Sequence, residues 1–464
     1  MSNLSVLGSC DHRDGACAGP KQQNSSAFCL CAQTPFTGRT QPSDKIVKGK
    51  ELLDRYYRLK IDKTWFIQTH SMDPLMQVQS SYTLFSSKYL PLVISLLSLV
   101  VLYFYMGQRP AIATGLGIAL GISLYHAAFG FTSAWRRFLT EGWGAGLKAQ
   151  IVMLAVVVTL FFPVLDSGTI LGHRASGFVA PAGTGVVVGA FVFGIGMQIA
   201  GGCASGTLFT VGGGSIRMVV TLITFMLGSV IATVHLPFWH TLPKWKAVSM
   251  VTLWGWEQAL VLHLIVFALL YLFVRRVENR SFLVNEAEDT SKTPLFQRIT
   301  QGPWPLVLGA VALALLNFAM LALLGHPWGI TSGITLWGGK MVSFFGADLS
   351  DIPYWSGRMA TLDRSLFKSD ASATNIGIVA GAMSAAVLAG KFGKSQNVTT
   401  KGILTALIGG LMLGYGARLA YGCNIGAFFS GVASGSVHGW VWLFAALAGN
   451  MIGVRIRKAY SYST

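Results

Sequence analysis

The sequence predicts an all-α, polytopic membrane protein, a helical bundle built from an inverted repeat with broken or re-entrant intramembrane helices. Three observations lead to this prediction: the composition, a series of long apolar segments, and two similar stretches rich in Gly and Cys. Of the 464 residues, 52% are hydrophobic and only 11% are charged. Soluble domains carry about 25% charged residues, so this composition excludes an ordinary soluble enzyme.

Ten apolar segments are candidate membrane spans, because a helix needs about 20 apolar residues to cross the hydrocarbon core. They are residues 89–107, 111–134, 149–165, 184–201, 217–235, 258–274, 303–324, 373–390, 402–420 and 438–454. Three further stretches, 203–215, 327–346 and 423–436, are apolar but rich in small residues. We expect the first and third to continue broken helices and the second to be re-entrant or interfacial.

The basic residues predict the orientation of the chain. The net charge is +17, and Lys and Arg gather in the tails and in loops between apolar segments, as the positive-inside rule expects. No nucleic-acid recognition motif accompanies the charge, so we expect no nucleic-acid partner. If the basic loops at 136–148, 275–298 and 391–401 are cytoplasmic, the amino terminus is cytoplasmic too. Segments 184–216 and 402–436 then cross the membrane in opposite directions.

The remaining organisation follows from composition. Residues 1–70 form a polar tail that we expect to be flexible and cytoplasmic, with 71–274 as the first half of the membrane domain, 275–302 as a cytoplasmic linker and 303–464 as the second half. Residues 51–69 are a candidate interfacial helix, and Met72 is a candidate alternative start. The tail holds four of the six cysteines (Cys10, Cys17, Cys29 and Cys31), but their spacing is a weak zinc signature, and we expect no metal or cofactor.

Two segments of the chain repeat one another at an offset of 220 residues. Eight residues between Gly189 and Phe209 are identical to their counterparts between Gly409 and Phe429, and these include the pair Cys203 and Cys423. With the opposite directions expected from the loop charges, this predicts an inverted-topology repeat, a common transporter architecture.

The Gly–Cys pairs predict a site for a small anion. Gly202-Cys203 and Gly422-Cys423 lie where an apolar helix stops, and a new half-helix starting at Ala204 or Asn424 would present free N–H groups and a partial positive charge. Two such starts meeting at the midplane would bring the thiols together. The candidate substrate-binding residues are Cys203, Cys423, Gly202, Gly422, Ser205, Gly206, Asn424, Gly426 and Arg418. We assign no catalytic residue.

Simpler interpretations exist for each feature. Glycines before the cysteines are also explained by close helix packing, and a buried cysteine is often only a small hydrophobic residue. Arg418 is expensive inside an apolar segment, which favours a functional role, but it could snorkel to the surface or pair with an acid.

GGCASGTLF from Gly201 and YGCNIGAFFSG from Tyr421, with PWGITSGITLWG from Pro327 between them, resemble the YeeE/YedE family of bacterial inner-membrane sulfur transporters. The resemblance covers residues 110–455. It implies an hourglass-shaped protein in which intramembrane helices meet at a constriction, and uptake of thiosulfate or a related sulfur or selenium species past cysteines. Cys203 and Cys423 match the repeat cysteines of the family. Thr132 and Ser133 stand where many members have an earlier cysteine.

We therefore expect a membrane transporter, not an enzyme, that takes up thiosulfate or a related small sulfur-containing anion through a cysteine-lined constriction in the inner membrane. The alternatives are a membrane enzyme that handles thiol redox or persulfide chemistry, a transporter of a selenium compound, and an accessory membrane subunit. A cytoplasmic sulfur-carrier or sulfurtransferase protein is a candidate partner, alongside the lipid bilayer. No Walker A motif is found, so we do not expect ATP coupling within the chain.

Overall fold

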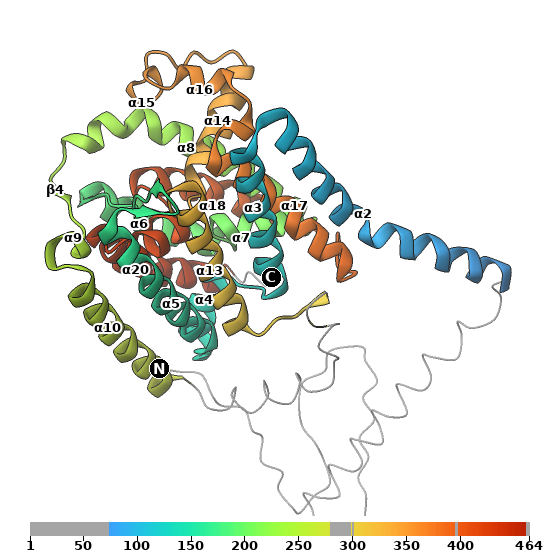
Figure 1. Ribbon diagram of the computed structural model, residues 1–464, viewed down its shortest axis with the longest axis horizontal. Coiled ribbons are helices and arrows are strands. Elements are labelled where there is room, and N and C mark those ends of the chain that lie inside the picture. Colours follow the sequence, from blue (N-terminus) through green and yellow to red (C-terminus); the bar gives the residue numbers. More distant parts are fainter. Residues whose placement is uncertain (1–73, 279–297, 299–300, 395–397, 461–464) are drawn as a thin grey trace, which may run out of the picture. The chain divides into compact units, whose positions relative to one another are not determined.

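The computed structural model describes residues 74–278, 298, 301–394 and 398–460, and the described chain is mainly helical (Figure 1). The helices of the first half are α2 (Pro74–Met106), α3 (Gln108–His126), α4 (Phe131–Glu141), α5 (Ala145–Ser167), α6 (Thr184–Ala200), α7 (Ala204–Gly212), α8 (Ile216–Thr241), α9 (Met250–Trp254) and α10 (Trp256–Val277). Those of the second half are α13 (Leu306–Leu324), α14 (Thr331–Phe344), α15 (Pro353–Ser356), α16 (Met359–Asp363), the 3₁₀ turn η1 (Leu366–Lys368), α17 (Asp370–Leu388), α18 (Thr400–Leu419), the π-helix η2 (Asn424–Phe429), α19 (Ser430–Ala433) and α20 (Val437–Ala459).

The strands are short and lie in the connections. Strands β1 (Thr169–Ile170) and β2 (His173–Arg174) form one antiparallel pair, and β3 (Pro181–Gly183) and β4 (Lys244–Ala247) form another. In the described ranges, nine helical segments are long and apolar enough to cross a membrane. The predicted all-α polytopic fold is thereby confirmed. The tail 1–70, the candidate helix at 51–69 and most of the linker 275–302 lie outside the described residues.

The predicted span 111–134 lies within a candidate membrane span of the structure, Gln108–Glu141, but that segment contains a break that the sequence did not predict. Residues 111–134 are not a continuous helix, because α3 ends at His126 and α4 begins at Phe131. Between them Ala128 has a φ of 45°, and Gly130 is extended. A residue in the left-handed conformation ends a helix. Because the break is only four residues long, hydropathy averaged over about 20 residues does not reveal it.

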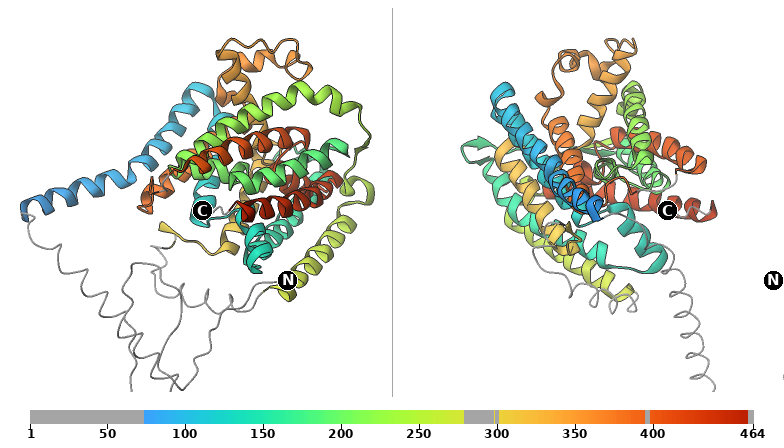
Figure 2. Two further views of the ribbon diagram at one scale, coloured as in Figure 1. Left: turned by 180° about the vertical axis from the view of Figure 1, so that it is seen from behind. Right: turned by 90° about the vertical axis from the view of Figure 1, so that its right-hand side faces the viewer.

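The helix pairs are reciprocal between the two halves. Helix α6 packs against α20 and α18 against α8, while α3 packs against α17 and α5 against α13. Helix α10 lies at the edge of the bundle (Figures 1 and 2). A Cβ on Gly189 would lie 2.7 Å from the carbonyl oxygen of Gly416, and one on Gly409 2.5 Å from the nitrogen of Ala200. These glycines allow α6 and α18 to approach closely, which confirms the packing interpretation for them.

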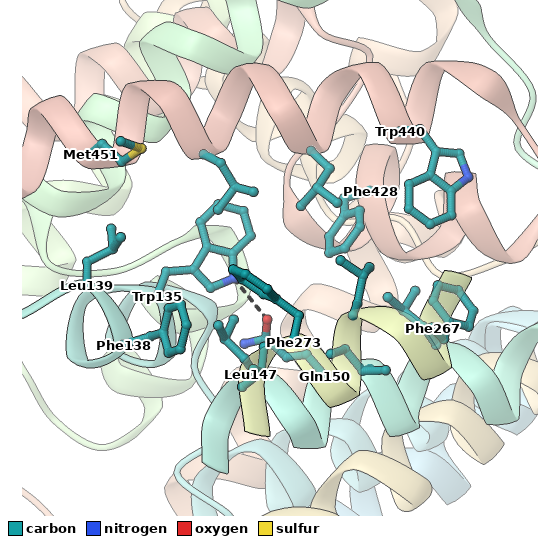
Figure 3. A pocket seen from close by; sticks show the side chains of 16 residues that line it. Trp135, Phe138, Leu139, Leu147, Gln150, Phe267, Phe273, Phe428, Trp440 and Met451 are labelled. Carbon is teal, nitrogen blue, oxygen red and sulfur yellow. Dashed lines mark hydrogen bonds between the residues drawn. The ribbon is translucent and has the colours of Figure 1, made fainter. Parts of the chain in front are cut away.

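A groove with apolar walls runs between α10 and α20, over α4 and α5 (Figure 3). Its volume is ≈ 280 Å³. Gln150 lines the wall, and its side-chain oxygen accepts a hydrogen bond of 2.9 Å from the indole nitrogen of Trp135. The oxygen of this amide is therefore already paired.

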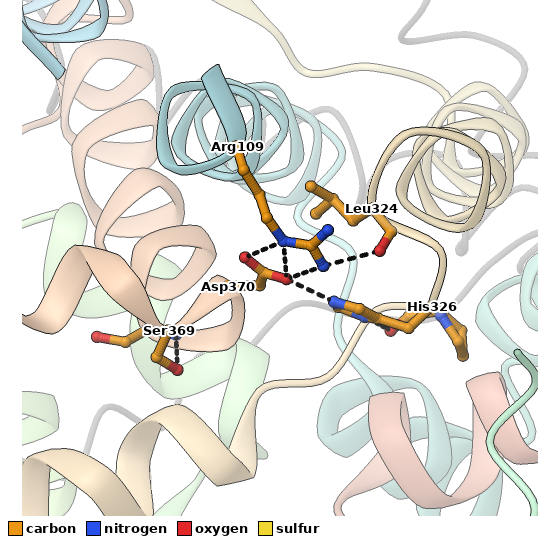
Figure 4. A network of polar contacts seen from close by, with 7 residues as sticks. Arg109, Leu324, His326, Ser369 and Asp370 are labelled. Atoms are coloured by element: carbon orange, nitrogen blue, oxygen red, sulfur yellow. Dashed lines mark hydrogen bonds and ion pairs between the residues drawn. The ribbon is translucent and has the colours of Figure 1, made fainter. Parts of the chain in front are cut away.

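A polar network ties three helices together at one end of the bundle (Figure 4). The guanidinium of Arg109 in α3 donates to the carboxylate of Asp370 in α17 at 2.6 Å and to the carbonyl of Leu324 in α13 at 2.8 Å. Nε2 of His326 donates to the same carboxylate at 2.9 Å. Charged partners at helix ends fix the relative position of α3, α13 and α17.

Candidate functional site

Two helix breaks with the same backbone geometry form the candidate site. Helix α6 is followed by Gly201 with a φ of 82°, and α18 is followed, one residue later, by Tyr421 with a φ of 59°. These left-handed residues end the first helix of each pair. New helical segments then begin at Ala204 and at Asn424, which confirms the two predicted half-helix starts.

Each cysteine is the N-cap of its half-helix. The Cys203 sulfur accepts a hydrogen bond from the backbone N–H of Gly206, and the Cys423 sulfur accepts one from the N–H of Ile425, both at 3.4 Å. Sulfur thus takes the position of the Ser, Thr or Asp oxygen that usually caps a helix. The Ser205 hydroxyl lies 3.4 Å from the Cys203 sulfur, so this predicted site residue does lie beside its cysteine.

The two cysteines lie in one part of the protein core. Both are free thiols, with exposures of 1% for Cys203 and 0% for Cys423, and both belong to the same apolar cluster. Helix α7, which follows Cys203, contacts η2, which follows Cys423. The elements that carry the two thiols are therefore neighbours, although they lie 220 positions apart in the sequence.

Two buried residues of the second half-helix, Asn424 and Gly426, lack contacts that buried residues usually have, within the part of the chain that the structure describes. The Asn424 side chain is fully buried, yet neither its oxygen nor its nitrogen has a hydrogen-bond partner among the described residues. Gly426 is buried too, and a Cβ placed on it would have no heavy atom within 4 Å. A buried amide without partners costs free energy, so the Asn424 side chain has an unmet need for a hydrogen-bond partner.

The other predicted glycines differ in their surroundings. A Cβ on Gly422 would lie 2.6 Å from the backbone nitrogen of Ala427, and one on Gly206 would lie 3.4 Å from the Cys203 sulfur. Gly202 has looser neighbours, the nearest at 3.5 Å. Gly422 is therefore required for the tight turn, whereas a side chain at Gly206 would lie against the Cys203 sulfur.

Arg418 lies in a separate cavity of ≈ 380 Å³, together with Tyr354, Arg358, His240 and Tyr421. Its guanidinium donates to the Tyr354 hydroxyl at 3.1 Å and lies 5.0 Å from the centre of that ring. No described contact joins it to either thiol. Its connection with the site runs through Tyr421, which precedes the second Gly–Cys pair and lines the same cavity.

Two arginines near the first break were not predicted. Arg217 donates to the carbonyl of Ile199 at 3.2 Å, and Arg457 donates to the carbonyl of Gln198 at 3.1 Å. Cations at a helix C-terminus offset its partial negative charge. Arg217 follows the Gly-rich turn 212–214 by three residues, and this proximity is the sequence signal that could have pointed to it.

Comparison with known proteins places the chain in a family. Residues 126–452 match the family described as "Sulphur transport". The chain is 27% identical over 362 residues to a protein named thiosulfate transporter TsuA from Spirochaeta thermophila, with coverage of 73% of this chain and 96% of the relative. A TsuA from Escherichia coli K12 is 24% identical over 345 residues, covering 72% of this chain and 90% of the relative.

A further relative matches a shorter region. A protein named probable transporter YedE, from Escherichia coli K12, is 30% identical over 152 residues, which are 33% of this chain and 37% of the relative. The chain thus spans little more than a third of that relative. The family match covers more than half of the chain, and it includes both helix breaks and both buried cysteines. The chain therefore belongs to the sulphur transport family.

Proposed function

We propose that this protein is an uptake transporter for thiosulfate or a related small sulfur-containing anion, which passes Cys203 and Cys423 at a constriction between α7 and η2. The observation that carries the proposal is the unpartnered amide of Asn424, which is fully buried in the residue next to Cys423. Relatives that align over most of their length bear the name thiosulfate transporter, which supports the choice of substrate.

The proposed binding chemistry uses neutral donors. The N–H groups at the start of each half-helix, the Asn424 amide and the two S–H groups offer hydrogen bonds and a partial positive charge to an anion. A fixed cation in direct contact would hold the anion more strongly. Conduction requires release as well as binding, so neutral donors suit a transport pathway.

The arginines suggest how the anion reaches and leaves the constriction. Arg418 and Arg358 line the cavity that borders Tyr421 before the second break. Arg217 and Arg457 lie at the end of α6, before the first break. In this proposal the first pair attracts the anion and the second pair receives it, with Cys423 and Cys203 in between.

The proposed orientation follows from the basic loops. The amino terminus is cytoplasmic, and the protein lies in the plasma membrane as two halves of opposite topology. The reciprocal helix pairs support this proposal, because α6–α20 becomes α18–α8 when the halves are exchanged. The glycine contacts between α6 and α18 are equivalent under the same exchange, because Gly189 lies against Ala420 and Gly409 lies against Ala200. A cytoplasmic sulfur-carrier or sulfurtransferase protein is the proposed recipient of the sulfur.

The test is uptake of ³⁵S-labelled thiosulfate by cells that lack other uptake routes. We expect Cys203→Ala and Cys423→Ala each to abolish accumulation at normal expression levels. A variant in which Cys10, Cys17, Cys29 and Cys31 are all replaced by Ala is the matched control and should transport normally. Normal uptake by both single variants would show that the site is misassigned. Competition by unlabelled sulfate, sulfite, thiosulfate and selenite then defines the substrate.

The thiol-redox alternative makes a different prediction. If Cys203 and Cys423 cycled between dithiol and disulfide, mild oxidation of the purified protein would produce a reversible change in gel mobility. The names of the relatives favour transport over this chemistry. We expect no such change.

A further inference from the structure

Trp442 is a fully buried side chain of α20 that contacts the second helix break at two points. Its indole nitrogen donates a hydrogen bond of 3.2 Å to the carbonyl oxygen of Gly422. Its ring stacks on the ring of Phe428, with centroids 6.2 Å apart and an angle of 7° between the ring planes. Gly422 directly precedes Cys423, and Phe428 belongs to η2, which begins directly after it. One side chain therefore contacts the chain on both sides of Cys423.

Both contacts affect the backbone of Cys423. The carbonyl oxygen of Cys423 accepts hydrogen bonds from the N–H groups of Ala427, at 2.9 Å, and Phe428, at 3.3 Å. The bond from Phe428 spans five residues, as in a π-helix. Trp442 thus holds the residue before Cys423 through its N–H group, and it holds through its ring the residue that bonds to the Cys423 carbonyl.

The position of Trp442 is itself fixed by close packing of α20 on α6. A Cβ on Gly194 of α6 would collide with the carbonyl oxygen of Ala446 in α20, so the two backbones are in direct contact. The ring of Phe193, also in α6, lies against the indole with centroids 5.6 Å apart. The indole therefore has little room to move, and its N–H group defines where the Gly422 carbonyl lies.

The first break is held by different donors. There the guanidinium groups of Arg217 and Arg457 donate to carbonyl oxygens near the end of α6, at 3.2 and 3.1 Å. The indole of Trp442 instead donates directly beside Cys423. A change at Trp442 should therefore act on Cys423 and spare Cys203.

We propose that Trp442 is a positioning residue for Cys423. It fixes the direction of the thiol and of the first N–H groups of η2, and it does so through Gly422 and Phe428 without touching the anion. Without the indole N–H, the buried Gly422 carbonyl loses this donor, and the turn that carries the thiol is no longer held from outside. The role of this positioning in uptake rests on the proposed transport function, in which Cys423 meets the anion.

The reactivity of the two thiols tests the proposal in purified, full-length protein whose tail cysteines are replaced by Ala. Trp442→Phe keeps an aromatic ring but removes the N–H group. The rates at which methyl methanethiosulfonate modifies Cys423 and Cys203 are measured by peptide mass spectrometry. We expect the ratio of the two rates to change about tenfold, as for the loss of one buried hydrogen bond. In cells, the same variant should take up labelled thiosulfate more slowly at normal expression.

The matched control is Trp355→Phe, which removes a buried indole N–H from the Thr233 hydroxyl, 3.0 Å away in another part of the structure. It should leave the ratio of rates unchanged, because a general loss of stability exposes both thiols. If Trp442→Phe does not fold, Phe428→Leu removes the stacked ring and should change the same ratio.

An unchanged ratio in the Trp442→Phe or Phe428→Leu protein would overturn the proposal, as would an equal change in Trp355→Phe. The labelling needs no substrate, so its result does not depend on the proposed function. A changed ratio with normal thiosulfate uptake would support the positioning role and would contradict the passage of the anion past Cys423.

Discussion

At the scale of single residues, Asn424 is the most informative side chain. An amide with no partner among the described residues is unfavourable in an apolar core, and its presence indicates selection for something other than stability. Asn317 gives the contrast. It is equally buried, but its oxygen accepts from the Trp328 N–H at 2.7 Å, and its nitrogen donates to the Ser430 hydroxyl at 3.4 Å. The two asparagines are therefore equally buried, but only the amide of Asn317 is paired.

This contrast predicts opposite effects for matched substitutions. Asn424→Leu should stabilise the protein by about 1 kcal/mol or more, because it removes an unpaired amide of similar volume, and should abolish thiosulfate uptake. Asn317→Leu should destabilise it by about 1–3 kcal/mol, since it leaves the Trp328 N–H without its acceptor. Thermal unfolding in detergent and ³⁵S uptake measure both effects. A destabilised Asn424→Leu variant would contradict the assignment of a ligand-binding amide.

Gly426 gives a second prediction at this scale. A methyl group fits beside Gly426 without a clash, so Gly426→Ala should leave the melting temperature unchanged or slightly raised. The same methyl group would occupy the proposed anion site and should lower the uptake rate about tenfold or more. Gly422→Ala is the control for a steric effect, because it should unfold the turn and reduce expression. Normal uptake by Gly426→Ala would exclude this space from the pathway.

At the scale of elements, the network that joins α3, α13 and α17 responds to pH. Burial alone would lower the pKa of His326, but its hydrogen bonds to the Asp370 carboxylate and the Pro327 carbonyl raise that pKa above its ordinary value. Both ring nitrogens face acceptors, at 2.9 and 3.0 Å, so the imidazolium form is the favoured one. The interaction therefore stabilises the fold most when His326 is protonated.

The sign of this effect sets the third prediction. A folded-state pKa above the unfolded value of about 6.5 means that the stabilisation is complete below pH 6.5 and is lost as the pH rises through the folded-state pKa. The difference in melting temperature between wild type and His326→Gln should therefore be largest at pH 5.5–6 and shrink toward pH 9. His173→Gln, in an exposed hairpin, is the control. A difference that is independent of pH would show that His326 contributes by packing alone.

At the scale of the whole molecule, the reciprocal helix pairs suggest a protein whose two halves are exchanged by a two-fold axis. Exchange by such an axis in the membrane plane brings the equivalent breaks together from opposite leaflets. The same pairing places glycines of α6 against α18, where larger residues would force the half-helices apart. The inverted arrangement that we propose would account for both the helix pairs and these glycine contacts.

Accessibility from the two sides of the membrane tests this orientation. In protein without tail cysteines, Leu171→Cys and Trp245→Cys should react with a membrane-impermeant maleimide in intact cells, since both positions are exposed and lie in connections that we propose to face outward. Lys394→Cys should react only after permeabilisation. Cys203 and Cys423 are buried and should contribute little background. Labelling of Lys394→Cys alone in intact cells would reverse the proposed topology.

The sequence by itself determined what depends on local signals. Composition and apolar segments identify a polytopic helical protein, and the Gly–Cys pairs identify helix starts at Ala204 and Asn424, because a helix end is set by a few consecutive residues. The same reasoning missed the break after His126, where no Gly–Cys pair marks the turn, and treated Arg418 as part of the cysteine site.

Which distant residues meet could be seen only in the folded chain. The fold placed Arg418 beside Tyr354 in a separate cavity, left the Asn424 amide without a partner among the described residues, and formed the groove between α10 and α20. Each of these depends on contacts between segments far apart in the chain. Hydropathy and spacing report which residues favour burial, but not which neighbour each one finds there.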